Sequence, residues 1–490
     1  MLLLVIIYFG FFAYFAWQNF RYAVGFFILT LPVYLIRFKI GNLPSTLLEA
    51  EFVGLFLVWI IKYFKTDFPI IVNFIKKQRG LFIFIGLFFV ASVVNIFISG
   101  ITDSNYWHMT VEALGLWRAY FLEPMLLFVI LCGRTVILSH AYRQAGEAEG
   151  RVEGSVPTID SSTTLRYAQN DKLNASDLIV FLALSTISIS MVAILQKISP
   201  WFFPPQLWDD IVGGRVTSFF TTPNAIGLYI APVLFLILII IIKKLQAKNY
   251  KLIVFKDQLF NCLIVVLILG LLAILLSVSQ GAWVALVAGV MVFIYFIGWK
   301  KFVVVITLVG MALALYLPSV RMAVLFQDPA GQNRLKLWSY SGEYLSQSPQ
   351  NFIFGAGIRK FFDKIQKPHY NNKDLEPLQY PHNLFLNFWT EIGLIGALSF
   401  VGIILYLFWL SWQVRKNDKI LGVGLMAVLT VFCVHGLVDV PYFKNDLAFI
   451  FWIIVSVILN HAYWQAGEAQ RACLERQSNR AESKDLDRLA

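Results

Sequence analysis

Long apolar runs, each the length of a membrane span, recur along almost the whole chain and constrain its fold more than any other feature. A helix needs roughly 20 apolar residues to cross a bilayer, and only helices or closed barrels satisfy their backbone polar groups there. The runs lie at 1–17, 21–36, 46–64, 80–98, 110–132, 177–196, 223–242, 258–277, 281–298, 301–317, 384–411, 420–438 and 446–461. We therefore predict an all-α polytopic membrane protein with about twelve or thirteen transmembrane helices, the first two of which are short enough to form one broken element.

Composition agrees with this prediction and argues against a nucleic-acid partner. Of 490 residues, 58% are hydrophobic and 14% charged, whereas soluble domains contain about 25% charged residues. A nucleic-acid binder would gather its net charge of +11 on one soluble face, but the basic residues here lie between apolar runs. The first run lacks a basic start and a cleavage site, so we expect it to be retained as a span.

The four cysteines predict no metal site and no disulfide framework. They show neither CxxC spacing nor neighbouring histidines, and most lie in or beside apolar runs, where cysteine usually behaves as a small hydrophobic residue. These residues are Cys132, Cys262, Cys433 and Cys473.

Basic residues between the spans predict the orientation. Segments 62–79, 133–176, 243–257, 298–301, 413–419 and the tail from 461 contain 5, 5, 5, 2, 3 and 5 Lys or Arg, against 0, 2 and 1 in 99–109, 196–222 and 440–446. Because basic loops stay cytoplasmic, we predict that the first set lies on the cytoplasmic side of the cell (inner) membrane. The long segment 318–381 is then predicted to lie on the extracytoplasmic side. The predicted parts are N-terminal helices 1–132, a cytoplasmic insert 133–176, central helices 177–317 with an outer loop 196–222, an extracytoplasmic catalytic loop 318–383 with short helices, C-terminal helices 384–461 and a cytoplasmic tail 462–490.

A short peptide occurs twice, each time after a predicted span. His140–Glu147 reads HAYRQAGE and His461–Glu468 reads HAYWQAGE. Repeats that build folds recur every 20–50 residues, and these copies share no core pattern. We interpret the first, with the polar sequence after it, as a mobile repeat translated into disordered cytoplasmic peptide rather than as a regulatory element.

The long outer loop carries the main candidates for chemistry. Arg334 and Trp338 are spaced i, i+4, so on a helix they share a face, where a guanidinium can hold phosphate while the indole stacks on a sugar or lipid. His382 and Asn383 precede a span that carries Glu391. A histidine at the mouth of a helix can act as a general base near neutral pH; the competing interpretation is an interfacial histidine with no chemical task.

Three further outer elements carry candidates. Arg215 precedes Pro223–Asn224, where a span begins, and a helix N-terminus favours an anionic group; a plain turn with a solvated arginine is equally consistent. Gln280 lies in a tight turn between two spans. His435 and Asp439 are also spaced i, i+4 at the outer end of a span, where ionisable residues are functional candidates, although a structural pair is a serious alternative.

The order of these pieces resembles the O-antigen ligase and Wzy-type polymerase superfamily of bacterial envelope glycan assembly. The order is R…TPN, S-x-G-A-W, R-x-x-x-W…F-G-x-G…HN…E-x-G-x-x-G and H-G-x-x-D, over roughly 215–449. The resemblance implies a metal-independent glycosyltransferase without cofactor. It would take a glycan from a polyprenyl (undecaprenyl) diphosphate and transfer it to a glycan, lipid or protein hydroxyl outside the membrane.

By this resemblance, Arg334 clamps the diphosphate, His382 orients or deprotonates the acceptor hydroxyl, and Arg215 is a second phosphate contact. Many members carry arginine where this chain has Gln280. Either Arg215, Arg321 or Arg359 compensates, or diphosphate binding is weaker, or this member differs in substrate. The alternative function is a transporter or flippase of lipid-linked glycans, which would place ionisable groups near the bilayer midplane and show repeated helix sets. The spans from 177 to 317 contain almost no interior charge and no duplicated helix set is visible; Arg118 and Glu123 in the fifth predicted span are the exceptions.

Overall fold

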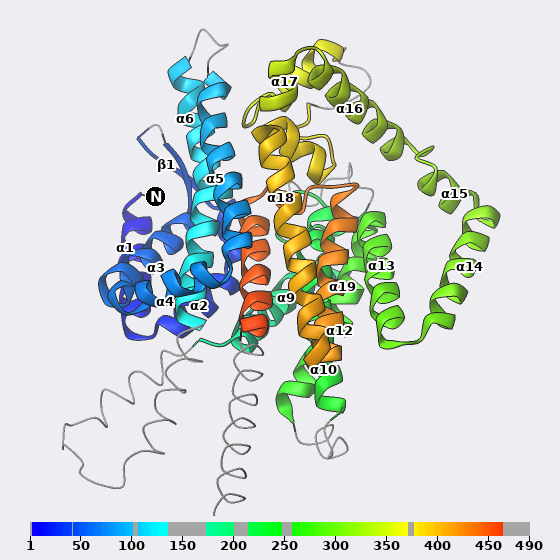
Figure 1. Cartoon of the computed structure of the whole chain (residues 1–490), viewed down its shortest axis with the longest axis horizontal. Helices are drawn as coiled ribbons and strands as arrows, with labels where there is room; N and C mark the ends of the chain where they lie inside the picture. Colours follow the sequence, from blue (N-terminus) through cyan, green and yellow to red (C-terminus); the bar gives the residue numbers. More distant parts are fainter. Residues whose placement is uncertain are drawn as a thin grey trace, which may run out of the picture.

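The computed structural model describes residues 2–41, 43–100, 106–135, 173–199, 214–246, 257–370 and 377–463. Within these residues every segment predicted as a span is helical (Figure 1), which confirms the all-α polytopic class. Nine helices in the described part are long and apolar enough to cross a membrane, while Leu3–Gln18 and Phe20–Leu29 are apolar but shorter. The nine are Arg79–Ile98, Val111–Thr135, Ala175–Ile198, Asn224–Leu245, Gln258–Ser277, Gln280–Ile297, Leu384–Asn417, Lys419–Gly436 and Asn445–Tyr463.

The N-terminal helices are followed by a small β-hairpin that the sequence did not predict. After α1 (Leu2–Gln18), α2 (Phe20–Leu29) and η1 (Leu31–Leu35), strands β1 (Arg37–Ile40) and β2 (Leu43–Thr46) pair antiparallel. Thr46 then caps α3 (Leu47–Lys62): its hydroxyl accepts from Glu49 N, while the Glu49 carboxylate accepts from Thr46 N. This capping box fixes where the hairpin ends and α3 begins.

The basic segment 62–79, expected to be a loop between spans, is largely helical. Helix α4 (Phe64–Lys77) is held by a buried carboxylate: Asp67 accepts from the Trp59 indole at 2.9 Å and lies 3.6 Å from Arg134. Because one ion pair neutralises this buried charge, an otherwise polar segment packs against the bundle.

Helix α5 (Arg79–Gly100) packs along α18 (Leu384–Asn417), and α6 (Tyr106–Trp117) continues through a π-helical turn, η2 (Arg118–Leu122). The turn places Arg118 between two carboxylates; its Nε lies 3.0 Å from Glu123, and it also pairs with Glu49. Arg118 and Glu123, two charged residues within a predicted span, therefore form a structural cluster with Glu49.

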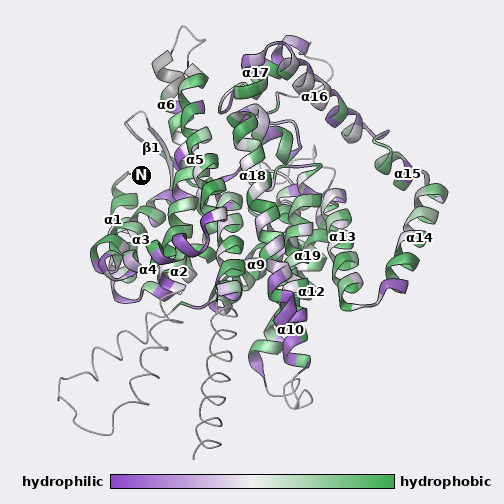
Figure 2. Ribbon diagram, in the orientation of Figure 1, coloured by the Kyte–Doolittle hydropathy of each residue, from purple (hydrophilic) through white to green (hydrophobic). Residues whose placement is uncertain are grey.

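The central and C-terminal helices form one continuous apolar core, and Figure 2 shows hydrophobic residues along most of their length. They are α9 (Ala175–Ile198), α10 (Asn224–Leu245), α12 (Gln258–Ser277), α13 (Gln280–Ile297), α18, α19 (Lys419–Gly436) and Asn445–Tyr463. Helix α14 (Lys300–Tyr316) packs beside α13 outside this core, and its described side chains are exposed or half-exposed. The ring of Phe388 packs at a tilt against Phe400 and Phe443, with centroid distances of 4.2 Å and 4.8 Å, and the buried Tyr442 joins the same aromatic cluster. This aromatic packing anchors the chain segment that follows α19.

The long loop 318–383 is more helical than expected. It contains α15 (Pro318–Val324), α16 (Pro329–Ser346), α17 (Pro349–Phe354), η6 (Phe361–Gln366) and η7 (Lys367–His369). A small core of its own holds it together: Leu337, Ala356, Phe361 and Ile365. In Figure 1, α16 and α17 lie at the end of the molecule opposite to where the last described helix ends.

Most of the predicted insert and tail lies outside the described residues. The flanking helices extend to Thr135 and begin again at Ala175, and the last one ends at Tyr463. His461 belongs to that last helix, whereas His140 lies in the part that is not described.

Candidate functional site

The turn after α19 brings together most of the predicted site residues. Asp439 is 4% exposed there, and three groups reach its carboxylate. His382 Nδ1 lies 3.4 Å from Oδ1, the Asn224 amide donates to Oδ2 at 3.1 Å, and Val440 N donates to Oδ1 at 2.9 Å. Elements far apart in the sequence therefore converge on one buried carboxylate.

Asp439 is held in its charged form. Burial alone would raise the pKa of this carboxyl, but the hydrogen bond and positive charge of His382 and the Val440 N–H together keep the pKa well below its usual value. The carboxylate is therefore ionised at neutral pH. It favours the tautomer of His382 with the proton on Nδ1, which leaves Nε2 as the basic nitrogen.

Two neighbours fix the backbone around His382. The Trp338 indole donates to the Pro381 carbonyl at 2.9 Å, and the Asn383 amide donates to Leu437 O at 3.1 Å while its oxygen caps α18. His382 itself has φ of +52°, a left-handed conformation that is uncommon for a residue with a Cβ. Trp338 and Asn383 thus help to hold His382 in position.

Arg334 lies beside the same turn. Its Nε donates to the Val438 carbonyl at 2.9 Å, one residue before Asp439. This bond orients the guanidinium, and its two terminal nitrogens have no hydrogen-bond partner in the described part of the chain. A guanidinium held in this way presents two parallel donors to an anion.

Arg215 is more fully engaged. Its guanidinium donates to Ser277 O at 2.8 Å, to Val278 O at 3.2 Å and to Asn224 Oδ1 at 3.0 Å, and burial lowers its pKa. Since Asn224 in turn binds Asp439, this geometry fits a residue that positions the site. Its role as a phosphate contact stays a prediction.

Gln280 and His435 differ in their access to solvent. Gln280 is the exposed first residue of α13 and directly follows the turn that Arg215 binds. His435 is 2% exposed and is packed against Gly281: a Cβ on that glycine would lie 3.2 Å from His435 Nε2. Asp439 lies beyond the end of α19, and its N–H bonds the His435 carbonyl at 3.0 Å. This packing favours the structural interpretation of His435.

Glu391 is not part of the cluster of polar residues around Asp439. It lies near a kink in α18, where Gly393 has φ of +75°, and it accepts a 2.7 Å hydrogen bond from Arg359 N. The kink packs closely against the FGAG sequence at Phe354–Gly357. A Cβ on Gly355 would lie 2.4 Å from Trp389 O, and Ala356 N donates to the carbonyl of Thr390. The glycine motifs therefore allow two backbones to touch.

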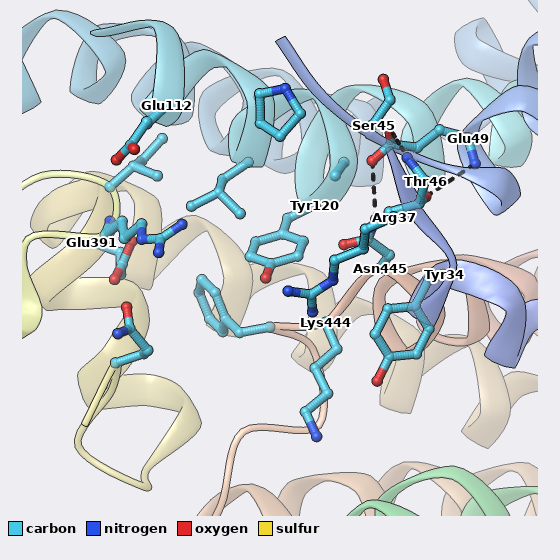
Figure 3. Close-up of a pocket in the computed structure, with 18 of the residues that line it drawn as sticks. Tyr34, Arg37, Ser45, Thr46, Glu49, Glu112, Tyr120, Glu391, Lys444 and Asn445 are labelled. Atoms are coloured by element: carbon cyan, nitrogen blue, oxygen red, sulfur yellow. Dashed lines mark hydrogen bonds between the residues drawn. The ribbon is translucent and has the colours of Figure 1, made fainter. Parts of the chain in front are cut away.

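A cavity of about 820 Å³ adjoins the cluster. It lies between the β-hairpin, α6 with η2, the 358–359 turn and the segment after Tyr442. Figure 3 shows Arg37 directed into its middle, with Glu112 and Glu391 across from Tyr34. Tyr380 belongs to both sites, because it lines the cavity and its ring contacts that of His382 at 5.1 Å.

Sequence reasoning missed three residues here. Asn224 stands inside the TPN motif and was considered only as a helix start. Tyr380 directly precedes the PHN motif, and Asn387 lies one turn into the following span. A polar residue so close to a motif was the available signal for each, but only the fold shows what these side chains face.

These observations define a class: a polytopic helical membrane protein with a polar site where loops and helix ends converge. Residues 265–401, less than a third of the 490 residues, match the family model described as O-Antigen ligase, the family that the motifs of this chain resemble. The match supports a membrane enzyme of the glycan ligase or polymerase type. It includes Gln280, Arg334, His382 and Glu391, whereas Arg215 and Asp439 lie outside it yet bind to the same cluster. No match was found among curated proteins.

Proposed function

We propose that this protein is a membrane glycosyltransferase that transfers a glycan from a polyprenyl diphosphate to an acceptor hydroxyl on the extracytoplasmic face. The observation that carries the proposal is the convergence of Arg334 and His382 on adjacent residues of one turn, Val438 and Asp439. An anion-binding group and a basic nitrogen held side by side meet the two needs of glycosyl transfer.

His382 would act on the acceptor. With Nδ1–H directed at Asp439, Nε2 takes the proton of the acceptor hydroxyl as its oxygen attacks the anomeric carbon. The ionised carboxylate stabilises the imidazolium that forms, as an acid partner does in other general-base pairs. His382 is 24% exposed in its side chain, so a substrate can reach it.

Arg334 would act on the leaving group. The bond between the anomeric carbon and the phosphate oxygen breaks as the new glycosidic bond forms, and negative charge grows on the diphosphate. Donors already oriented toward that charge stabilise the transition state more than the ground state. The bond to Val438 holds Arg334 in such an orientation.

The arrangement of the helices supports the extracytoplasmic placement. Helices α16 and α17 lie at one end of the molecule, and the helix end that precedes the predicted cytoplasmic tail lies at the other (Figure 1). The short loops predicted at the first end carry few Lys or Arg and the segments predicted at the second carry many, as the positive-inside rule requires; the segment 318–381 is too long to count in this rule.

The test is transfer by purified protein in lipid or detergent with a polyprenyl-diphosphate glycan. We expect His382→Ala and Arg334→Ala to reduce transfer by about 10²-fold or more while insertion and expression persist. Arg334→Lys keeps the charge but not the paired donors, and we expect it to recover little. Normal transfer by both alanine variants would refute the site, and movement of the lipid across a bilayer without transfer would indicate a flippase. A ladder of products would indicate a polymerase, and a single product a ligase.

A further inference from the structure

The cavity contains a buried amide with nothing to bind. Asn387 lines the cavity and is 1% exposed. Neither its Oδ1 nor its Nδ2 has a hydrogen-bond partner among the described residues. A buried amide without partners costs free energy of folding, so such a group usually serves a ligand or water.

The cavity also carries an excess of positive charge. Arg37, Lys39, Arg359 and Lys444 line it, and none lies within ion-pair distance of a carboxylate in the described part of the chain. Three acidic residues line it as well: Glu112, Glu49, which pairs with Arg118, and Glu391, which accepts from Arg359 N and attracts the Arg359 side chain. Because Arg118 neutralises Glu49, the four cations outnumber the two remaining carboxylates, and this excess favours an anionic ligand.

We propose that this cavity binds the acceptor saccharide and selects one that carries a negatively charged substituent, a carboxylate or a phosphate. The amide of Asn387, which can donate and accept, fits the hydroxyl groups of a sugar. Arg37 and Arg359 fit its acidic substituent. The assignment of this saccharide as the acceptor rests on the proposed function, whereas the binding of an acidic saccharide to the cavity does not.

The position of the cavity favours the acceptor over the glycan of the donor. Tyr380 is the residue shared with the cluster, and its ring contacts His382, the group assigned to the acceptor hydroxyl. Arg334, assigned to the diphosphate, does not line the cavity. A saccharide in the cavity would therefore approach the reaction from the side of the base.

The binding test uses the full-length protein and two probes of equal length, a galacturonic acid tetrasaccharide and a neutral galactose tetrasaccharide, measured by calorimetry. We expect the acidic probe to bind about tenfold or more tightly, as charge-assisted hydrogen bonds imply. The double variant Arg37→Gln, Arg359→Gln should abolish this difference, whereas Lys301→Gln, an exposed cation on α14, should not change it. Asn387→Leu should weaken both probes without lowering Tm.

Each outcome decides the question. Equal affinity of the wild-type protein for the two probes, or selective binding that survives the double variant, would overturn the proposal. Competition between the acidic probe and undecaprenyl diphosphate would overturn the acceptor assignment, and simultaneous binding would support it. Because Arg334→Ala should retain probe binding, loss of transfer with intact binding tests the proposed function separately from the cavity.

Discussion

Asp439 Oδ1 lies 3.4 Å from His382 Nδ1, although the two residues are 57 positions apart in the chain. Helices α18 and α19 separate them in sequence, and the turn after α19 returns the carboxylate to the start of α18. The carboxylate also binds Asn224 at the start of α10. One buried charge thus connects three helix ends, and its removal should affect both stability and transfer.

Asp439→Asn should lower stability in a pH-dependent way. The folded protein holds the pKa of Asp439 below that of the unfolded chain, so its contribution is present above the unfolded pKa of about 3.9 and is lost as pH falls through the lower folded pKa. We expect a difference on the order of 1–3 kcal/mol between wild type and variant that is constant above about pH 5 and narrows below about pH 4. Thermal unfolding in detergent between pH 3 and pH 8 measures it.

The same variant should lower kcat for transfer on the order of 10²-fold, because the imidazole loses the partner that orients it. A difference in stability that grows as the solution becomes more acidic would contradict the assigned ionisation of Asp439.

Trp338→Phe tests whether the indole positions His382. The variant keeps the ring contact with Phe326 but loses the N–H that binds Pro381 O. We expect kcat to fall roughly tenfold with an unchanged KM for the donor, and stability to fall by about 1 kcal/mol. Trp299→Phe, in the turn before α14, is the matched control and should change neither. A higher KM with unchanged kcat would instead support sugar stacking by Trp338.

The positions of the helices could be predicted from the sequence because an apolar run of span length satisfies its backbone hydrogen bonds in a bilayer by forming a helix. Helix α4 and the hairpin β1–β2 could not. The segment 62–79 is polar by composition, and its helix depends on Asp67 finding Trp59 and Arg134 from two other elements. Contacts between side chains of different elements therefore decide the structure of this segment, and the local sequence pattern does not show them.

The proximity of several candidate residues could be expected from the motifs, whereas their roles in a site stay predictions. The motifs selected Arg334, His382 and Asp439, and the structure brings these together. Spacing alone could not show that Arg215 binds backbone carbonyl groups, or that Glu391 lines the cavity instead of joining the residues around Asp439. The charges that line the cavity come from segments as distant as β1 and the turn before the last helix, a juxtaposition that exists only in the fold.

Gly281→Ala should disturb the turn that binds Arg334. A Cβ at this position would lie 3.0 Å from Val438 Cγ2 and 3.1 Å from His435 Cδ2, so both neighbours must shift. We expect a loss of about 1–2 kcal/mol in stability and a larger loss of transfer. Gly86→Ala is the control, since no atom lies within 4 Å of its Cβ, and helix propensity predicts a neutral or stabilising effect of up to about 1 kcal/mol. Equal behaviour of the two variants would argue against close packing at Gly281.

Gln280→Arg should strengthen binding of the donor. Gln280 is the exposed first residue of α13, beside the turn whose carbonyl groups Arg215 binds, and Arg215 keeps only Nη1 without a hydrogen-bond partner in the described part of the chain. A second guanidinium there adds paired donors for the diphosphate, so we expect the donor KM to fall about fivefold and kcat to stay unchanged. The gain should shrink as salt rises, because it comes from an exposed charge.

The control for this variant is Gln258→Arg, which places arginine at the exposed first residue of α12, a helix that begins on the predicted cytoplasmic side. Both variants replace glutamine by arginine at the first residue of a helix, and they differ in the end of the molecule at which that residue lies. A lower KM in both variants would mean a general attraction of the anionic donor to a more basic protein. A lower KM in Gln280→Arg alone places the diphosphate at the start of α13, on the side of Arg334 and away from the basic loops. An unchanged KM in Gln280→Arg, with Arg334→Ala still inactive, would leave Arg334 as the phosphate contact and exclude Gln280 from the donor site.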